Sequence, residues 1–270
     1  MDDRLATLIT YRRLATASMR ARAQYRLTFG LDFAAQLVAG VSEFLAILVI
    51  FHHLPRLGGW SLPEVAFLYG LAGISFALTD ALIGQLDSLG QMIRMGSFDV
   101  FLVRPLSSLL QVATSDMQLK RLTKGVQAGA VLAYAIANLH IAWSAGKLVM
   151  LTAAIGSGAA IFSGVWVAGS AIGFWTTDIH EVVNSFTYGG NYLTSYPINI
   201  FGAWTRRFLA FVVPMAFVAY YPSLFILGKP DAVIGLPALA FVTPLIAVLT
   251  LSVGLGVWRA GVRHYRSTGS

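Results

Sequence analysis

The chain has 270 residues, of which 57% are hydrophobic and 11% charged, and its mean hydropathy is +0.70. A soluble domain carries about 25% charged residues, so this composition excludes an ordinary soluble protein and indicates one solvated by lipid. The net charge of +7 then reflects basic residues that flank membrane spans, not nucleic-acid binding. The absence of cysteine excludes disulfides, thiol catalysis and thiolate metal sites.

The first 26 residues predict an interfacial helix. Within residues 4–26 apolar side chains recur at helical spacing, while five of the six arginines lie largely on other faces. Such an amphipathic helix would lie at the cytoplasmic surface and lead into the first span; a plain juxtamembrane tail is the alternative.

Six apolar stretches follow, each long enough to cross a hydrocarbon core of ~30 Å. They cover residues 31–54, 64–85, 125–143, 148–175, 207–227 and 232–258. The sequence therefore predicts an all-α integral membrane protein with six transmembrane helices, forming a single domain over residues 1–270. No metal-binding cluster and no catalytic constellation of side chains appears along it.

Basic residues predict the orientation. If the N-terminus is cytoplasmic, three of the nineteen Lys and Arg residues fall outside: Arg56, Lys147 and Lys229. The other sixteen, including the pair Arg206 and Arg207, fall inside. The positive-inside rule then places both termini in the cytoplasm.

Two acidic residues lie inside predicted spans: Glu43 in the first and Asp80 in the second. A charge at mid-bilayer costs at least ~2.5 kcal/mol, so each should face protein or water. Both are candidates for a transport path. For Glu43, a hydrogen-bonded role in helix packing is an equal alternative.

Small residues and prolines mark the later spans. Ala160, Gly164 and Ala168 recur every fourth residue, which favours close helix packing within the bundle over a dimer seam. Pro214, Pro237 and Pro244 lie within the fifth and sixth stretches and are candidate hinges. The segment from Tyr188 to Tyr196 is expected to be a second cytoplasmic or interfacial element.

Residues 88–124 form the one long predicted cytoplasmic link. Apolar residues recur in it at helical spacing, so it should lie against the membrane or another protein. None of the four lysines stands in the G-x-x-x-x-G-K-[ST] pattern that cradles phosphates, so the chain has no nucleotide-binding motif of its own. We therefore expect neither an enzyme nor a bound cofactor.

The stretch from Arg94 to Leu106, RMGSFDVFLVRPL, resembles the cytoplasmic signature of bacterial ABC-type export permeases, in the type-2 branch of antibiotic and drug exporters. Gly59-Trp60-Ser61 at the start of the second span and Tyr220-Tyr221-Pro222 within the fifth follow in the order that this family shows. The resemblance extends over nearly the whole chain.

This resemblance implies a multi-pass permease of the bacterial cytoplasmic membrane that couples to a dimer of ATP-binding cassette subunits, in which ATP and Mg would be bound. The coupling residues would be Arg94, Gly96, Asp99, Arg104 and Pro105. A second permease subunit, a paralogue in preference to an identical copy, would complete the path for a hydrophobic or amphipathic molecule. The alternatives are an ion-driven secondary transporter and a non-transporting assembly factor.

Overall fold

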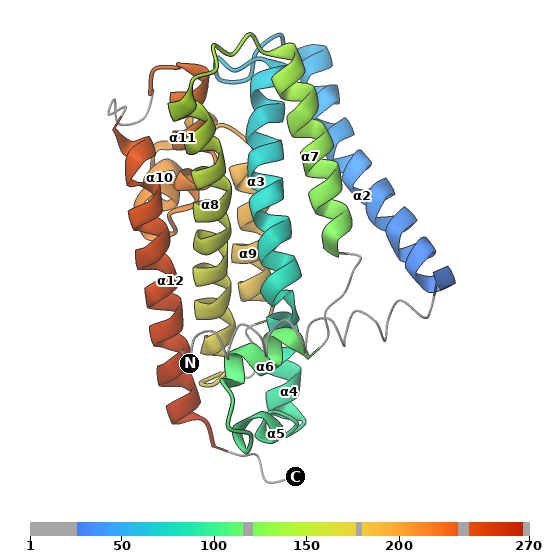
Figure 1. The fold of residues 1–270 in the computed structure, drawn as a ribbon, viewed down its shortest axis with the longest axis vertical. Helices are drawn as coiled ribbons and strands as arrows, with labels where there is room; N and C mark the ends of the chain where they lie inside the picture. The colour runs from blue at the N-terminus through green and yellow to red at the C-terminus, as the bar shows by residue number, and fades with distance from the viewer. Residues whose placement is uncertain (1–25, 116–120, 177–179, 232–237, 267–270) are drawn as a thin grey trace.

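The computed structural model describes residues 26–115, 121–176, 180–231 and 238–266. Over these residues the protein is helical, with one isolated β-bridge between Leu57 and Trp60 and no strand. The long helices run along the longest axis of the molecule (Figure 1). We call the end that carries residues 84–114 the lower end and the end that carries residues 54–61 the upper end, as they appear in that view. The predicted interfacial helix and Pro237 lie outside the described residues.

Helices α2 (Arg26–His53) and α3 (Leu62–Ile83) form the first hairpin, closed at the upper end. Gly58 and Gly59 both have positive φ in this connection, a conformation that favours glycine. The backbone N–H of Ser61 donates to the carboxylate of Glu64 at 2.7 Å, which satisfies a donor at the start of α3. Helix α3 is buried along most of its length and is the core of the bundle.

The segment after α3 turns through short helices at the lower end. They are η1 (Gly84–Ser88), α4 (Leu89–Arg94), α5 (Asp99–Leu102) and α6 (Ser108–Thr114). These elements pack under the bundle (Figure 1).

Helices α7 (Arg121–Asn138) and α8 (Ala145–Ile172) pack against α3 through small residues. A Cβ on Gly70 or Gly73 would overlap Leu132 or Ala128 of α7, and one on Gly158 would overlap Ser75 of α3. Hydroxyl groups add contacts between helices: Thr79 of α3 donates to the Ala159 carbonyl of α8 at 2.9 Å. Close backbone approach and hydroxyl bonds of this kind stabilise helix pairs in lipid.

Helix α12 (Leu239–His264) lies beside α8. A Cβ on Gly254 would lie 2.4 Å from the Gly164 carbonyl oxygen, so the two backbones touch at this crossing. Gly164 therefore serves packing within the chain, as the small-residue pattern predicts. Pro244 lies on the exposed side of α12, and the helix continues past it.

Helix α9 (His180–Thr194) runs from the lower end toward the upper end. Midway along it Tyr188 donates to Asp87 of η1, and beyond its upper end Asn199 donates to the Gly58 carbonyl. The segment containing Tyr188 and Tyr192 is thus inside the bundle. Its predicted position as a cytoplasmic or interfacial element stays a prediction.

Residues 203–227 form a bent hairpin that begins and ends near the upper end. It comprises α10 (Ala203–Arg207), η3 (Phe208–Val212), η4 (Met215–Phe217) and α11 (Tyr220–Leu227). Just before it Asn199 contacts Gly58, and just after it Lys229 contacts Gly59 and Glu64. Its two halves meet at 78°, with Pro214 at the break. The stretch predicted as the fifth span is thus broken at Pro214, a proline predicted as a hinge.

Four helices are long and apolar enough to cross a membrane among the described residues: the regions Phe33–His53, Leu62–Arg94, Ala145–Ile172 and Leu239–His264. The bent hairpin would be a fifth if it crossed, but both its ends lie at the same end of the bundle. Helices α7 and α9 lie beside α3 in the bundle without meeting that criterion (Figure 1). The described residues therefore contain four candidate spans, or five with the bent pair, where the sequence predicts six.

Candidate functional site

Residues 94–106, which we call the coupling turn, project from the lower end. Gly96 has a φ of 68°, in the left-handed region that favours glycine, and it reverses the chain after α4. The Gly96 N–H donates to the Ile93 carbonyl at 3.1 Å, and the Ser97 hydroxyl donates to the Met92 carbonyl at 3.2 Å. These local bonds give the turn a defined shape.

Phe98 anchors the coupling turn to the bundle. Its side chain is fully buried, and its ring centroid lies 5.1 Å from that of Phe174 and 5.2 Å from that of Tyr265. Trp258 of α12 completes the cluster at 6.4 Å. The turn is therefore packed against the lower ends of both α8 and α12.

Asp99 connects the coupling turn to the end of α12. The Tyr265 hydroxyl donates to Asp99 Oδ1 at 2.8 Å. Partial burial and this hydrogen bond raise the pKa of the Tyr265 phenol to about 12, so it remains a neutral donor at physiological pH. A movement of the turn is thereby transmitted to α12 through a side-chain bond as well as through packing.

The tip of the coupling turn is exposed. The Gln111 amide of α6 donates to the Phe101 and Leu106 carbonyls at 2.9 and 3.0 Å, which holds the loop between them. Val103 is 83% exposed at the tip. The neighbouring exposed side chains are Met95, Val100, Leu102 and Leu106, together with Arg94, Arg104 and Pro105. The surface thus combines apolar side chains with two arginines.

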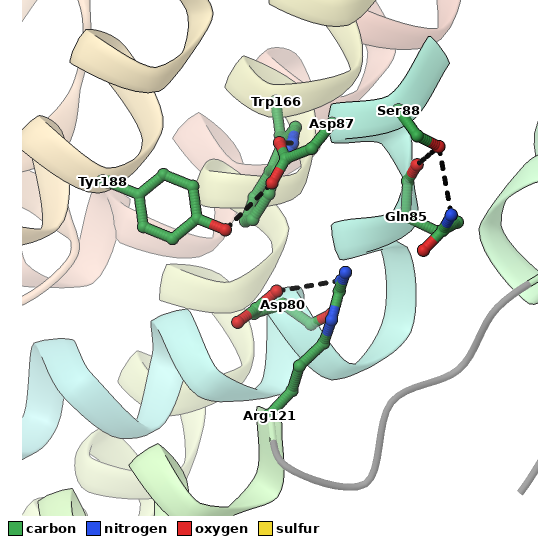
Figure 2. A network of polar contacts seen from close by, with 7 residues as sticks. All are labelled: Asp80, Gln85, Asp87, Ser88, Arg121, Trp166 and Tyr188. Carbon is green, nitrogen blue, oxygen red and sulfur yellow. Dashed lines mark hydrogen bonds and ion pairs between the residues drawn. The ribbon is translucent and has the colours of Figure 1, made fainter. Parts of the chain in front are cut away.

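Above the coupling turn, an ion pair joins α3 to α7. Arg121 Nη1 lies 3.0 Å from Asp80 Oδ1 and also donates to the Asp80 backbone carbonyl at 3.0 Å (Figure 2). Gly84 leaves the space that the guanidinium occupies, because a Cβ there would overlap it. Asp80 therefore lies in a helix-to-helix pair and does not line the cavity described below.

Asp87 joins three elements in the same region. Its carboxylate accepts hydrogen bonds from the Trp166 indole of α8 and the Tyr188 hydroxyl of α9, each at 2.9 Å (Figure 2). The Tyr188 ring in turn lies 5.2 Å from the Lys124 ammonium, which also lies 5.6 Å from the Phe76 ring. Tyr188 therefore connects the start of the lower-end segment to the interior of the bundle.

Glu43 faces a polar cavity of about 110 Å³ between α2, α3, α7 and α9. Its carboxylate accepts a hydrogen bond from the Tyr192 hydroxyl at 2.7 Å and a longer one from the Tyr69 hydroxyl at 3.4 Å. The Gln127 amide donates to the same Tyr69 hydroxyl at 3.3 Å. Lys124 and Tyr188 line the other part of the cavity. A space of this volume and polarity can hold several waters or a small polar group.

Comparison with protein families gives a match over residues 37–269 to the family described as "ABC-2 family transporter protein". The chain belongs to this family. The match contains the coupling turn, every residue that lines the cavity except Gln36, and every described helix except the first residues of α2. No curated protein and no solved structure matches the chain.

This ABC-2 transporter protein is a non-catalytic membrane permease, and its family implies a separate ATP-binding partner. Of the predicted site residues, Arg94, Gly96, Asp99, Arg104 and Pro105 lie together in one turn. Glu43 and Asp80 lie in separate networks.

Lys124, Gln127 and Tyr192 were not predicted as site residues. For Lys124 and Gln127 the available signal was a polar side chain among the apolar residues of α7. Lys124 had been assigned to the cytoplasmic link because it stands beside Lys120 and Arg121.

Proposed function

We propose that this ABC-2 transporter protein is the transmembrane subunit of an ATP-driven exporter and that the coupling turn docks on its ATP-binding subunit. The observation that carries the proposal is the exposed tip at Val103, held by Phe98 and Gln111 on a rigid base. A permease that hydrolyses no nucleotide must receive work through a contact of this kind. Rigid attachment lets a push on the tip reach α8 and α12 instead of being absorbed by a loose loop.

The path from the turn to the interior supports the same proposal. Asp99 accepts a hydrogen bond from Tyr265, which follows α12, and Asp87 accepts hydrogen bonds from residues of α8 and α9. Nucleotide-dependent closure of the ATPase would favour one arrangement of these contacts over another, which a two-state switch requires. Pro214 and Pro244 are candidate positions for bending during that change.

The lower end is placed in the cytoplasm under this proposal, in a bacterial inner membrane. Arg206 and Arg207 then lie toward the outer face, but Arg94, Arg104 and the arginines of α12 keep the positive excess inside. The cargo is a hydrophobic or amphipathic molecule, including drugs and antibiotics. A paralogous permease beside this one completes the path.

The docking proposal is tested with Val103→Asp, purified from its native membrane in a mild detergent. A carboxylate at the centre of the apolar tip should be desolvated on docking, so we expect the amount of co-purified P-loop ATPase to fall at least about ten-fold. Quantitative mass spectrometry of the purified complex measures this amount.

Leu54→Asp is the matched control. Like Val103, Leu54 is an exposed aliphatic side chain (48% exposed), but it lies at the upper end. It should retain the ATPase. Equal amounts of ATPase in both variants, or none with the unaltered protein, would refute the docking proposal and favour an ion-driven transporter or an assembly factor.

A further inference from the structure

The polar cavity has two ends of opposite charge. Glu43 with Tyr69 and Tyr192 forms one end, and Lys124 with Phe76 and Tyr188 forms the other. Among the described residues, no opposite charge lies within 4 Å of either Glu43 or Lys124. A charge at membrane depth without an ion partner is costly unless water or a ligand compensates it.

The distance between the two ends follows from helix geometry. Gly40 of α2 lies against Gln127 of α7, since a Cβ at Gly40 would overlap the Gln127 amide. Both helices run upward, with Glu43 three residues above Gly40 and Lys124 three residues below Gln127. At 1.5 Å per residue the two Cα levels are about 9 Å apart, and flexible side chains shorten the separation of the charges.

Aromatic rings surround both charges. The Lys124 ammonium rests on the faces of Phe76 and Tyr188, which hold it without neutralising it. Tyr192, one helical turn above Tyr188, directs its hydroxyl to Glu43. The two ends are therefore held in place by neighbouring positions of the same helix, α9.

We propose that this cavity binds the zwitterionic head group of an amphipathic molecule, with its ammonium at Glu43 and its anionic group at Lys124. This assignment rests on the proposed transport function and names the class of cargo. A zwitterion neutralises both ends at once, whereas a simple cation or anion leaves one charge uncompensated. The side of the cavity at Ala39 of α2 is exposed and gives the tail a way out into lipid.

The test measures binding of three probes to the full-length protein purified in dodecyl maltoside, by native mass spectrometry. The probes are lysophosphatidylethanolamine, which carries both charges, lysophosphatidylglycerol, which lacks the amine, and dodecylamine, which lacks the phosphate. We expect lysophosphatidylethanolamine to bind most tightly. Glu43→Gln should weaken the binding of lysophosphatidylethanolamine and of dodecylamine at least about ten-fold. Lys124→Met should weaken the binding of lysophosphatidylethanolamine and of lysophosphatidylglycerol to a similar extent.

Glu181→Gln and Lys147→Met are matched controls, because each removes the same kind of charge away from the cavity, and neither should change binding. If Glu43→Gln does not fold, Ala39→Phe fills the cavity from its exposed side while keeping both charges, and it should weaken lysophosphatidylethanolamine equally. If soluble phosphoethanolamine competes with the lysolipid, the head group alone is sufficient for binding. If it does not compete but the selectivity among the three lipid probes is kept, the tail is also needed for binding. Both outcomes support the site.

Equal binding of the three probes, or unchanged lysophosphatidylethanolamine binding in both charge variants, overturns the proposal. ATPase retention is measured on the same preparations. If no ATPase co-purifies but lysolipid binding is selective, the proposed function is contradicted and this inference is not. If the ATPase co-purifies but binding of the probes is not selective, this inference is contradicted and the proposed function is not.

Discussion

Asp80 and Arg121 show how the protein places a charge within its bundle. Their side chains are 5% and 13% exposed, and the guanidinium contacts both the carboxylate and the backbone carbonyl of Asp80. Two charges removed from water attract each other strongly, but each is also expensive to leave alone. The pair therefore holds α3 to α7 only while both partners are present.

We predict that Arg121→Met lowers the free energy of unfolding by about 3 kcal/mol, because it leaves the Asp80 carboxylate buried without its cation. The double variant Asp80→Asn with Arg121→Met should recover at least half of this loss, since no charge remains. Unfolding by SDS in mixed micelles measures both. Arg56→Met, at an exposed position in the upper loop, is the control and should change stability by less than about 0.5 kcal/mol.

Single residues were predictable to different degrees. Glu43 stands out in an apolar stretch, so its contact with protein or water could be inferred from the cost of a lone charge. Lys124 could not be recognised as its neighbour in the cavity, because the pairing of α2 with α7 depends on Gly40 and Gln127 meeting in three dimensions. The role of Asp80 was similarly hidden, since Arg121 is 41 positions away in the chain.

At the scale of elements, apolar character and membrane crossing are separate properties. Helix α9 carries Glu181, Asn184 and Asn191, so it does not have the composition of a span, yet it lies along α3 and α8. Polar side chains that would be costly to expose to lipid can be hydrogen-bonded by neighbouring protein groups. Residues 203–227 are more apolar but return to the end from which they start. Hydropathy alone therefore does not describe how these two segments lie in the bundle.

The contact between α8 and α12 gives a prediction for a pair of elements. Gly254→Ala should lower the free energy of unfolding by about 1–3 kcal/mol, because its methyl group would overlap the Gly164 backbone and force the helices apart. Gly256→Ala, two residues further along α12, meets nothing within 4 Å and should be neutral or stabilising by up to about 1 kcal/mol. The same SDS titration compares them. A similar change in both variants would show that helix propensity, not backbone contact, dominates.

At the scale of the whole molecule, the course of the chain shows which helices lead from one end of the bundle to the other. Helix α8 ends beside Phe98 at the lower end, and Asn199 contacts Gly58 at the upper end, so the chain must pass upward through α9. Helix α12 then returns to the lower end, where Tyr265 contacts Asp99. Helix α7 must likewise pass upward; its 18 residues extend about 27 Å, close to the thickness of a hydrocarbon core. Its polar residues include Lys124 and Gln127, which face the cavity, and Arg121, which pairs with Asp80, and together they lower its hydropathy.

This course predicts which positions share a side of the membrane, and the lack of cysteine makes it directly testable. Single cysteines replace three exposed residues: Ser97 in the coupling turn, Ser144 before α8 and Gly202 before α10. With α7 and α9 crossing and residues 203–227 re-entering, a membrane-impermeant maleimide should label Ser144→Cys and Gly202→Cys in intact cells. It should label Ser97→Cys only after permeabilisation.

The position of Gly202 separates the two possible fifth spans. If residues 207–227 crossed the membrane and α9 stayed in the cytoplasm, Gly202→Cys would be protected together with Ser97→Cys. If α7 did not cross, Ser144→Cys and Ser97→Cys would react from the same side. Labelling of Gly202→Cys and Ser144→Cys alone leaves α2, α3, α7, α8, α9 and α12 as the crossing helices, because each connection between them then joins ends on one side.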